Sequence, residues 1–296
     1  MTATSVLQRL FLWACLIIAG DAVTVAGAAP LPRLASAWQR EEAIEVRLVA
    51  ASTTLADSGK VMLAIEMRLR PDWQVYWRAP GDSGLPTRAT FDGSSNLAGA
   101  EILYPLPGRF VKDGEVTLGY HDGVLFPIIA RAVDATRPLD MTVHLSYGLC
   151  LNICMPMAGS FTIRVPAFGG AAMATADAAH IEVYRRRVPD IEQTRRLQLE
   201  SATLVDGDDG PQLDIIIKSM FVIGQPDAFV AGPPSLTFGR PAVLIDSDGK
   251  RASLRLPVTG PKAGALVGAP LRIIISERSI GAIEAMTTVQ GPPVVD

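Results

Sequence analysis

Two cysteines that lie four positions apart carry the most specific chemistry in this sequence. Cys150 and Cys154 lie within Tyr147–Pro156, and the whole chain contains only three cysteines and three histidines. Four residues of extended strand would separate two Cα atoms by about 13 Å, whereas a disulfide needs about 4.4–6.8 Å. If the two thiols pair, the chain must turn between them. Asn152 suits such a turn because asparagine tolerates left-handed backbone angles.

Such a close pair of thiols has two possible uses. One thiol can attack a foreign disulfide while its neighbour resolves the mixed disulfide, which is thiol–disulfide exchange. The alternative is an inert structural bridge, for which the chain-entropy estimate is only about 2 kcal/mol in so small a ring. Because a domain with a full hydrophobic core gains little from such a bridge, the sequence favours exchange, and the structural bridge stays open as the alternative.

The N-terminus has the features of an export signal, predicted over residues 1–28. A single positive charge precedes an apolar run at residues 10–19, and small residues follow at the expected cleavage site near Ala28. The run is shorter than the roughly 20 residues of a membrane-spanning helix. Cleavage would remove Cys15 and leave two cysteines in a compartment where disulfides persist. Lipid attachment at Cys15 is the alternative, and Trp13 argues against it because such sites favour small residues.

Composition narrows the class of protein. The chain has 296 residues, of which 49% are hydrophobic and 19% charged, so it has the material for a core and disorder is excluded. A formal net charge of -3 gives no electrostatic case for nucleic-acid binding. The sequence contains neither a Gly-x-Ser-x-Gly nor a His-Glu-x-x-His motif, so it does not indicate a serine hydrolase or a zinc protease.

Hydrophobic and polar residues alternate through residues 41–166, which is typical of strands with one buried face. The alternation is clearest over Lys60–Arg70 and Leu139–Tyr147, and a further strand is predicted at Phe161–Val165. In the first of these segments Glu66 is expected on the solvated face. Because Asp-Gly and other glycine-rich turn sequences separate these short segments, the pattern predicts an antiparallel β-sandwich.

The remaining sequence predicts a linker, one helix and a second, smaller β domain. The helix is expected over residues 178–187, ended or kinked by Pro189. The predicted parts of the chain are a signal peptide at 1–28, the sandwich at 29–166, a linker and helix at 167–196, and the second domain at 197–296. The strands predicted in this second domain are Leu197–Val205, Gln212–Lys218, Ala242–Asp246, Ser253–Pro257 and Leu271–Ser276. The second domain contains no cysteine or histidine, so its predicted role is binding or structural support.

Three segments of the first β region resemble a known family. The cysteine segment ending in Cys154-Met155-Pro156, together with Trp73–Gly84 and Gly119–Ile128, resembles the N-terminal periplasmic domain of the DsbD thiol:disulfide interchange family. The likeness is greatest to its ScsB-like members, in which three residues separate the cysteines, and it covers about Glu41–Val165. The resemblance implies a periplasmic, immunoglobulin-like domain that carries a redox-active cysteine pair and needs no cofactor.

The resemblance also implies partners and residue roles. A membrane-embedded thiol reductase of the DsbD/CcdA type would supply electrons, and periplasmic thioredoxin-like proteins would accept them in a protein-disulfide reductase reaction. Cys150 and Cys154 would form the redox pair, with Cys154 attacking client disulfides, and Phe110 and Tyr147 are the candidates for an aromatic shield. The sequence matches neither the membrane domain nor the thioredoxin module of full-length DsbD, so both partners are expected to be separate polypeptides. Such a relay could serve cytochrome c biogenesis, disulfide isomerisation or metal resistance.

Copper binding is the main alternative function. Cys150, Cys154, Met155 and Met157 supply the soft donors that Cu(I) prefers, and His144 or His121 could complete the set. The Cys-x3-Cys-x-Pro spacing is similar to that of the Sco copper proteins, but their thioredoxin fold alternates helices with strands, and this sequence does not. A binding module with an incidental disulfide is the third possibility.

Overall fold

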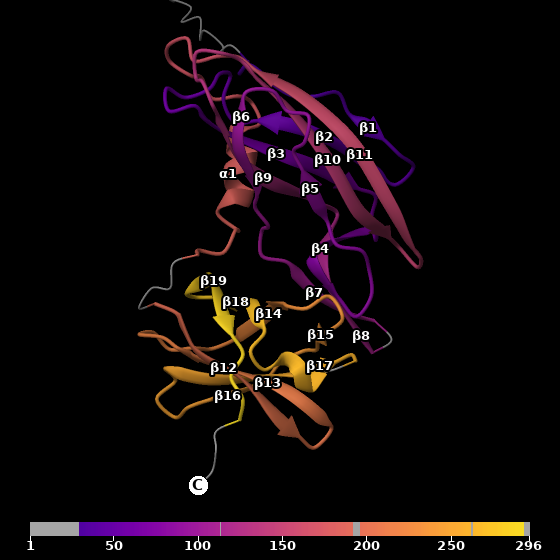
Figure 1. Cartoon of the computed structure of the whole chain (residues 1–296), viewed down its shortest axis with the longest axis vertical. Coiled ribbons are helices and arrows are strands. Elements are labelled where there is room, and N and C mark those ends of the chain that lie inside the picture. Colours follow the sequence, from indigo (N-terminus) through magenta and orange to yellow (C-terminus); the bar gives the residue numbers. More distant parts are fainter. Residues whose placement is uncertain (1–29, 113, 192–195, 262, 293–296) are drawn as a thin grey trace, which may run out of the picture. The chain divides into compact units, whose positions relative to one another are not determined.

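The computed structural model describes residues 30–112, 114–191, 196–261 and 263–292, so the predicted signal peptide and Cys15 lie outside the described residues (Figure 1). The elements, in chain order, are β1 Gln39–Arg40, β2 Ile44–Ala50, β3 Lys60–Leu69, β4 Gln74–Gly81, β5 Arg88–Thr90, β6 Leu97–Ile102, β7 Gly108–Lys112, β8 Glu115–His121, β9 Gly123–Ala132, β10 Leu139–Cys150, β11 Cys154–Val165, α1 Ala178–Arg185, β12 Gln198–Gly207, β13 Gly210–Lys218, β14 Pro226–Ala231, β15 Thr237–Phe238, β16 Ala242–Ile245, β17 Arg251–Thr259, η1 Ala263–Leu266, β18 Pro270–Glu277 and β19 Gly281–Thr288. No helix in these described ranges is both long and apolar enough to cross a membrane.

The first β region is an immunoglobulin-like sandwich of two antiparallel sheets, as the sequence predicts. One sheet has the strand order β1-β2-β3-β9-β6, and the other has the order β11-β10-β4-β8-β7, with β5 paired to β10. Along β10, every second residue from Leu139 to Leu149 is buried and joins the core, as the predicted alternation requires. Trp77 of β4 and Phe126 of β9 fill the same core and are fully buried.

The turn between β8 and β9 shows how local sequence fixes the point at which the chain crosses from one sheet of this sandwich to the other. Asp122 and Gly123 have positive φ angles of 63° and 149°. Aspartate and glycine tolerate these angles better than most residues, which is why Asp-Gly sequences favour tight turns. The turn places His121 at the last position of β8, where its Cα lies opposite that of Gln74 in β4.

The prediction that Glu66 faces solvent is wrong, because helix α1 covers that face of the first sheet. Glu66 is only 2% exposed and forms an ion pair with Arg47 at 2.6 Å. Arg47 also reaches Asp177, the residue before α1, at 3.1 Å. Ile181 of the helix packs on Val49 and its neighbours in the sheet. Alternation in β3 alone could not reveal this cover, since it comes from a segment more than a hundred residues later.

Helix α1 is found where the sequence predicts it, although it belongs structurally to the first β region as well as leading into the second. It spans Ala178–Arg185 and ends before Pro189. Thr175, just before the helix, donates its hydroxyl hydrogen bond to the Ala50 carbonyl at 2.5 Å. The segment after residue 166 is therefore tied to the edge of the sandwich by buried polar contacts as well as by Ile181.

The second β region also consists of two antiparallel sheets. One has the order β12-β13-β17-β15, with β16 paired to β17, and the other has the order β14-β18-β19. All five predicted strands are present, but β14, β15 and β19 were not predicted. Strand β14 begins with Pro226, and β19 carries Glu284, which is buried and paired with Arg272 at 2.6 Å. Proline and a buried charge both hide the hydrophobic pattern that marks a strand.

We expect Arg47→Ala to destabilise the first β region by about 3 kcal/mol, because Glu66 and Asp177 lose their buried cation and keep only the exposed Arg68 and Arg33 as partners. Arg164→Ala is the matched control. Arg164 pairs with Asp140 at 2.8 Å, but its side chain is 65% exposed, so we expect its removal to cost about 0–1 kcal/mol. Urea denaturation of both variants measures the difference, and equal midpoints would contradict a structural role for the buried cluster.

Candidate functional site

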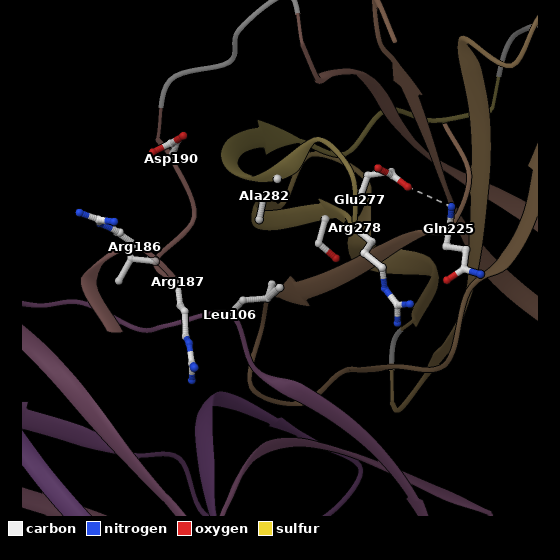
Figure 2. Close-up of a pocket in the computed structure, with 11 residues that line it drawn as sticks. Leu106, Arg186, Arg187, Asp190, Gln225, Glu277, Arg278 and Ala282 are labelled. Atoms are coloured by element: carbon white, nitrogen blue, oxygen red, sulfur yellow. Dashed lines mark hydrogen bonds between the residues drawn. The ribbon is translucent and has the colours of Figure 1, made fainter. Parts of the chain in front are cut away.

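One cavity, of about 570 Å³, lies beside the segment that leads from α1 to the second β region (Figure 2). Arg187, Asp190 and Glu277 are among its lining residues. Figure 2 shows Glu277 turned toward the backbone nitrogen of Gln225, from which it accepts a hydrogen bond at 3.2 Å. Its other oxygen accepts hydrogen bonds from the turn before β19, including one from the Ser279 nitrogen at 2.7 Å. The carboxylate therefore holds two loops, and the lining residues that the structure describes include no thiol or imidazole.

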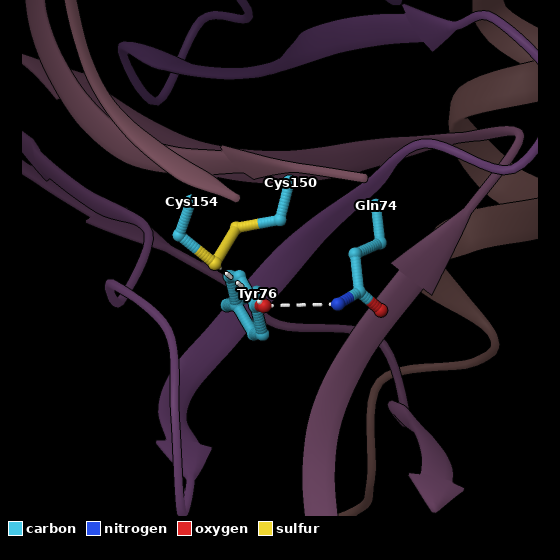
Figure 3. Close-up of a disulfide and its surroundings, with 4 residues drawn as sticks. All are labelled: Gln74, Tyr76, Cys150 and Cys154. Carbon is cyan, nitrogen blue, oxygen red and sulfur yellow. Dashed lines mark hydrogen bonds between the residues drawn. A yellow bond between two sulfur atoms is a disulfide. The ribbon is translucent and has the colours of Figure 1, made fainter. Parts of the chain in front are cut away.

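The cysteine pair forms a disulfide at the end of the β10–β11 hairpin (Figure 3). Cys150 is the last residue of β10 and Cys154 the first of β11, and their Cα atoms lie directly opposite each other, 4.2 Å apart. The chain turns between them as predicted. Asn152 lies in this turn but does not use the left-handed backbone angles that asparagine tolerates, since its φ is not positive.

A single cross-strand row carries the disulfide and two polar residues. The Cα of Cys150 is paired with that of Gln74, which is in turn paired with His121. Residues opposite each other in antiparallel strands point to the same face of a sheet. Because Leu149 and Val75, the neighbours of Cys150 and Gln74, are core residues, this row lies on the face of the second sheet turned away from the core.

Tyr76 reaches the disulfide from the same face of β4. Its hydroxyl oxygen lies 3.1 Å from the Cys154 sulfur and accepts a hydrogen bond from the Gln74 side-chain nitrogen at 2.8 Å (Figure 3). Tyr76 is only 2% exposed, although it faces away from the core. The loop containing Gly84 covers it, and a Cβ on this glycine would lie 2.5 Å from the Tyr76 ring. Burial raises the pKa of the Tyr76 phenol, and the hydrogen bond from Gln74 acts in the opposite direction.

The two sulfur-bearing residues differ in access. Cys150 is 2% exposed, whereas Cys154 is only partly buried. The turn beside Cys154 exposes apolar side chains, with Ile153 79% and Leu151 42% accessible. An approaching protein can therefore reach the sulfur of Cys154 more easily than that of Cys150.

A cavity of about 660 Å³ opens beside the disulfide and is lined by both cysteines. Phe110 of β7 also lines it, and its ring packs edge-on against the His121 ring with centroids 4.2 Å apart. Tyr147, the other candidate shield, is a core residue that is 6% exposed, and it is not among the lining residues.

The copper alternative gains no geometric support from the hairpin. Met155 and Met157 alternate with Cys154 along β11, so they lie on the opposite face of the strand. Met157 packs against the core. Within the part of the chain that the structure describes, no cluster of three or more His, Cys, Asp or Glu side chains could hold a metal ion.

Sequence reasoning found the cysteines and Phe110 and named His121 only as a possible copper ligand, but it did not assign Gln74 or Tyr76 to the site. Gln74 and Tyr76 are two positions apart on a strand whose other face carries Val75 and Trp77. That alternation was a usable signal that the two polar side chains share a face. Which strands flank β4 could not be read from the sequence, so their nearness to the cysteines was hidden.

Comparison with known proteins agrees with this geometry. Residues 43–166 match the family described as thiol:disulfide interchange protein DsbD, N-terminal, and residues 187–292 match a domain of unknown function. The first β region is thus a DsbD-like N-terminal domain, which supports thiol:disulfide interchange as its general activity.

One solved structure extends the likeness over both β regions. The crystal structure of the N-terminal periplasmic domain of ScsB from Proteus mirabilis aligns with a TM-score of 0.69 and 22% sequence identity, covering 87% of this chain and 99% of that one. At this identity the match establishes a common fold. No curated protein matches the chain by sequence.

We expect Gly84→Ala to displace Tyr76, because the new Cβ would overlap its ring and because Gly84 has a φ of 109°. Gly93→Ala is the matched control, since Gly93 has a φ of 77° but open space around its Cα. The control should cost about 1 kcal/mol through backbone strain alone, and Gly84→Ala about 1–3 kcal/mol more through overpacking. Denaturant midpoints, with near-ultraviolet circular dichroism to follow the tyrosine, measure both changes. Equal losses would contradict the close packing on Tyr76.

Proposed function

We propose that this chain relays electrons between proteins in the periplasm by reversible reduction of the Cys150–Cys154 disulfide. The observation that carries the proposal is a disulfide between directly opposed residues at a hairpin end, with one sulfur buried and the other within reach of a partner. The match to the DsbD N-terminal family supports the same chemistry. The solved relative is a periplasmic domain, which supports the compartment.

The proposed reduction is a two-step exchange in which electrons and protons balance. A thiolate of the donor attacks the sulfur of Cys154, the Cys150–Cys154 bond breaks, and the electron pair leaves on Cys150, which takes up a proton. The second donor thiolate then attacks the mixed disulfide and releases Cys154 as a thiolate. The donor dithiol is oxidised to a disulfide, and the chain holds two reduced cysteines.

Delivery to a client runs through the same sulfur. The Cys154 thiolate attacks the client disulfide and forms a mixed disulfide, and Cys150, after losing its proton, attacks Cys154 to release the reduced client. Cys150 suits the resolving role because it is 2% exposed and lies directly opposite Cys154. We propose a membrane-embedded thiol reductase as donor and thioredoxin-like proteins as acceptors.

Phe110 is the proposed shield of the pair. Its ring lines the cavity beside the disulfide and packs on His121, and it lies in β7, the edge strand of its sheet. A ring in this position limits the access of small oxidants to the reduced thiols, while a docking partner can displace an edge strand more easily than a central one. The copper alternative has no comparable observation in its favour.

The reduction potential of the pair separates exchange from an inert bridge. We expect a value above about -300 mV at equilibrium with glutathione, because structural disulfides typically lie below that range and labile ones above it. The measurement follows the thiol content of the full chain across a series of glutathione buffers. A potential below this range would remove the relay and leave the disulfide as a structural bridge.

Trapping tests the proposed roles of the two cysteines. We expect Cys150→Ser to accumulate a mixed disulfide between Cys154 and a client, because the resolving thiol is missing, and mass spectrometry of the adduct identifies that client. Cys154→Ser is the matched control and should trap little, since Cys150 is buried. Adducts that form through Cys150 and not through Cys154 would reverse the assigned roles.

A further inference from the structure

The contact between Tyr76 and Cys154 has a defined donor. In the disulfide the Cys154 sulfur carries no hydrogen, so the hydroxyl of Tyr76 must donate across the 3.1 Å that separate oxygen and sulfur. The phenol has one hydrogen. Gln74 donates its own amide hydrogen to the phenol oxygen at 2.8 Å, which leaves the single phenolic hydrogen free to point at sulfur.

We propose that Gln74 and Tyr76 are positioning residues that direct a hydrogen bond onto Cys154 and stabilise its thiolate once the disulfide is reduced. This inference rests on the proposed exchange function and identifies the residues that make Cys154, and not Cys150, the reactive cysteine. A disulfide sulfur is a weak acceptor, whereas a thiolate is charged, and hydrogen bonds to charged groups are about twice as strong as neutral ones. The contact therefore strengthens on reduction.

The surroundings keep this hydrogen bond in place. Tyr76 is 2% exposed beneath the Gly84 loop, so water has little access to the phenol. Burial raises its pKa, and it therefore keeps the proton that it donates. Gln74 lies two positions earlier on the same strand face, where it holds the phenol oxygen without competing for the sulfur.

The two cysteine sulfurs differ in whether a hydrogen-bond donor reaches them. Among the described residues, Tyr76 is the hydrogen-bond partner of the Cys154 sulfur, and no corresponding donor reaches Cys150, which is more deeply buried. Burial in apolar surroundings disfavours a thiolate, and a hydrogen-bond donor favours it. Cys154 is therefore the thiolate that attacks a client, and it is also the better leaving group when the donor's second thiol resolves the first mixed disulfide.

Other ionisable side chains line the same cavity and enter the electrostatic balance at Cys154. Asp72 precedes β4, Lys112 ends β7, and Glu115 and His121 lie in β8. Lys112 donates to the Asn152 side chain at 3.2 Å. The acidic and basic groups are thus mixed around the disulfide, so the direct hydrogen bond from Tyr76 is the feature that distinguishes one sulfur from the other.

The test measures the pKa of Cys154 without any partner protein. In the full chain carrying Cys15→Ser and Cys150→Ala, Cys154 is the only thiol, and its rate of alkylation by iodoacetamide is followed against pH. We expect Tyr76→Phe to raise the thiol pKa by about one unit, a tenfold loss of thiolate near neutral pH. Tyr147→Phe is the matched control, a buried tyrosine of the core, and should leave the pKa unchanged.

Two variants at Gln74 test the direction of the hydrogen bond. Gln74→Glu should raise the Cys154 pKa at least as much as Tyr76→Phe, because a carboxylate accepts the phenolic hydrogen and adds a negative charge. Gln74→Leu should raise it by less, since Tyr76 can still reach the sulfur. If Tyr76→Phe does not fold, the Cys154 pKa values of Gln74→Glu and Gln74→Leu test the proposal. An unchanged pKa in Tyr76→Phe, or in Gln74→Glu, would overturn the proposal.

The result of this pKa test can be separated from the result of the test of the proposed electron relay. A shifted pKa in a protein whose intact disulfide has a potential below about -300 mV would keep the inference and remove the relay. Normal exchange with an unshifted pKa would keep the relay and remove the positioning role of Tyr76.

Discussion

The register of the β10–β11 hairpin is the constraint on which the rest of the site depends. Twelve consecutive residues of β10 pair with β11, and core pairs such as Val143–Phe161 lock that register. A slip of one residue would turn every core side chain of the strand toward solvent. The hydrophobic core therefore decides that Cys150 and Cys154 meet directly opposite each other and face away from it. The chemistry at the hairpin end follows from packing along its whole length.

The same pairing explains why the site is built from residues distant in sequence. Strand β4 lies next to β10, which brings Gln74 opposite Cys150 and lets Tyr76 reach the sulfur of Cys154. On its other side β4 pairs with β8, and β8 pairs with β7, which brings His121 and Phe110 to the cavity. Strand β4 thus contributes two groups and β8 and β7 one each, so that neighbouring strands of one sheet give the disulfide both a hydrogen-bond donor and an aromatic neighbour.

Alternation and turn sequences predicted strands and turns, because these elements depend on residues that are close together in the chain. Alternation was sufficient to predict β10, the turn at Gly123 lies where the sequence predicts one, and the spacing of Cys150 and Cys154 was sufficient to predict that the chain turns between them. The burial of Glu66 was not predictable, because its cover comes from α1. Strand β19 was not predicted because it contains Glu284, a charged residue that is buried in an ion pair with Arg272. Nor could the nearness of Tyr76 to Cys154 be derived, since strand order is a property of the whole sandwich.

The buried triad of Arg47, Glu66 and Asp177 has a consequence for where the first folding unit ends. The family match stops at residue 166, yet Asp177 and Ile181 complete the charge balance and the cover of the first sheet. A fragment cut at that boundary would expose Val49 and leave the guanidinium with one carboxylate instead of two. The autonomous unit therefore extends through α1, and the sequence-family border falls inside it rather than at its edge.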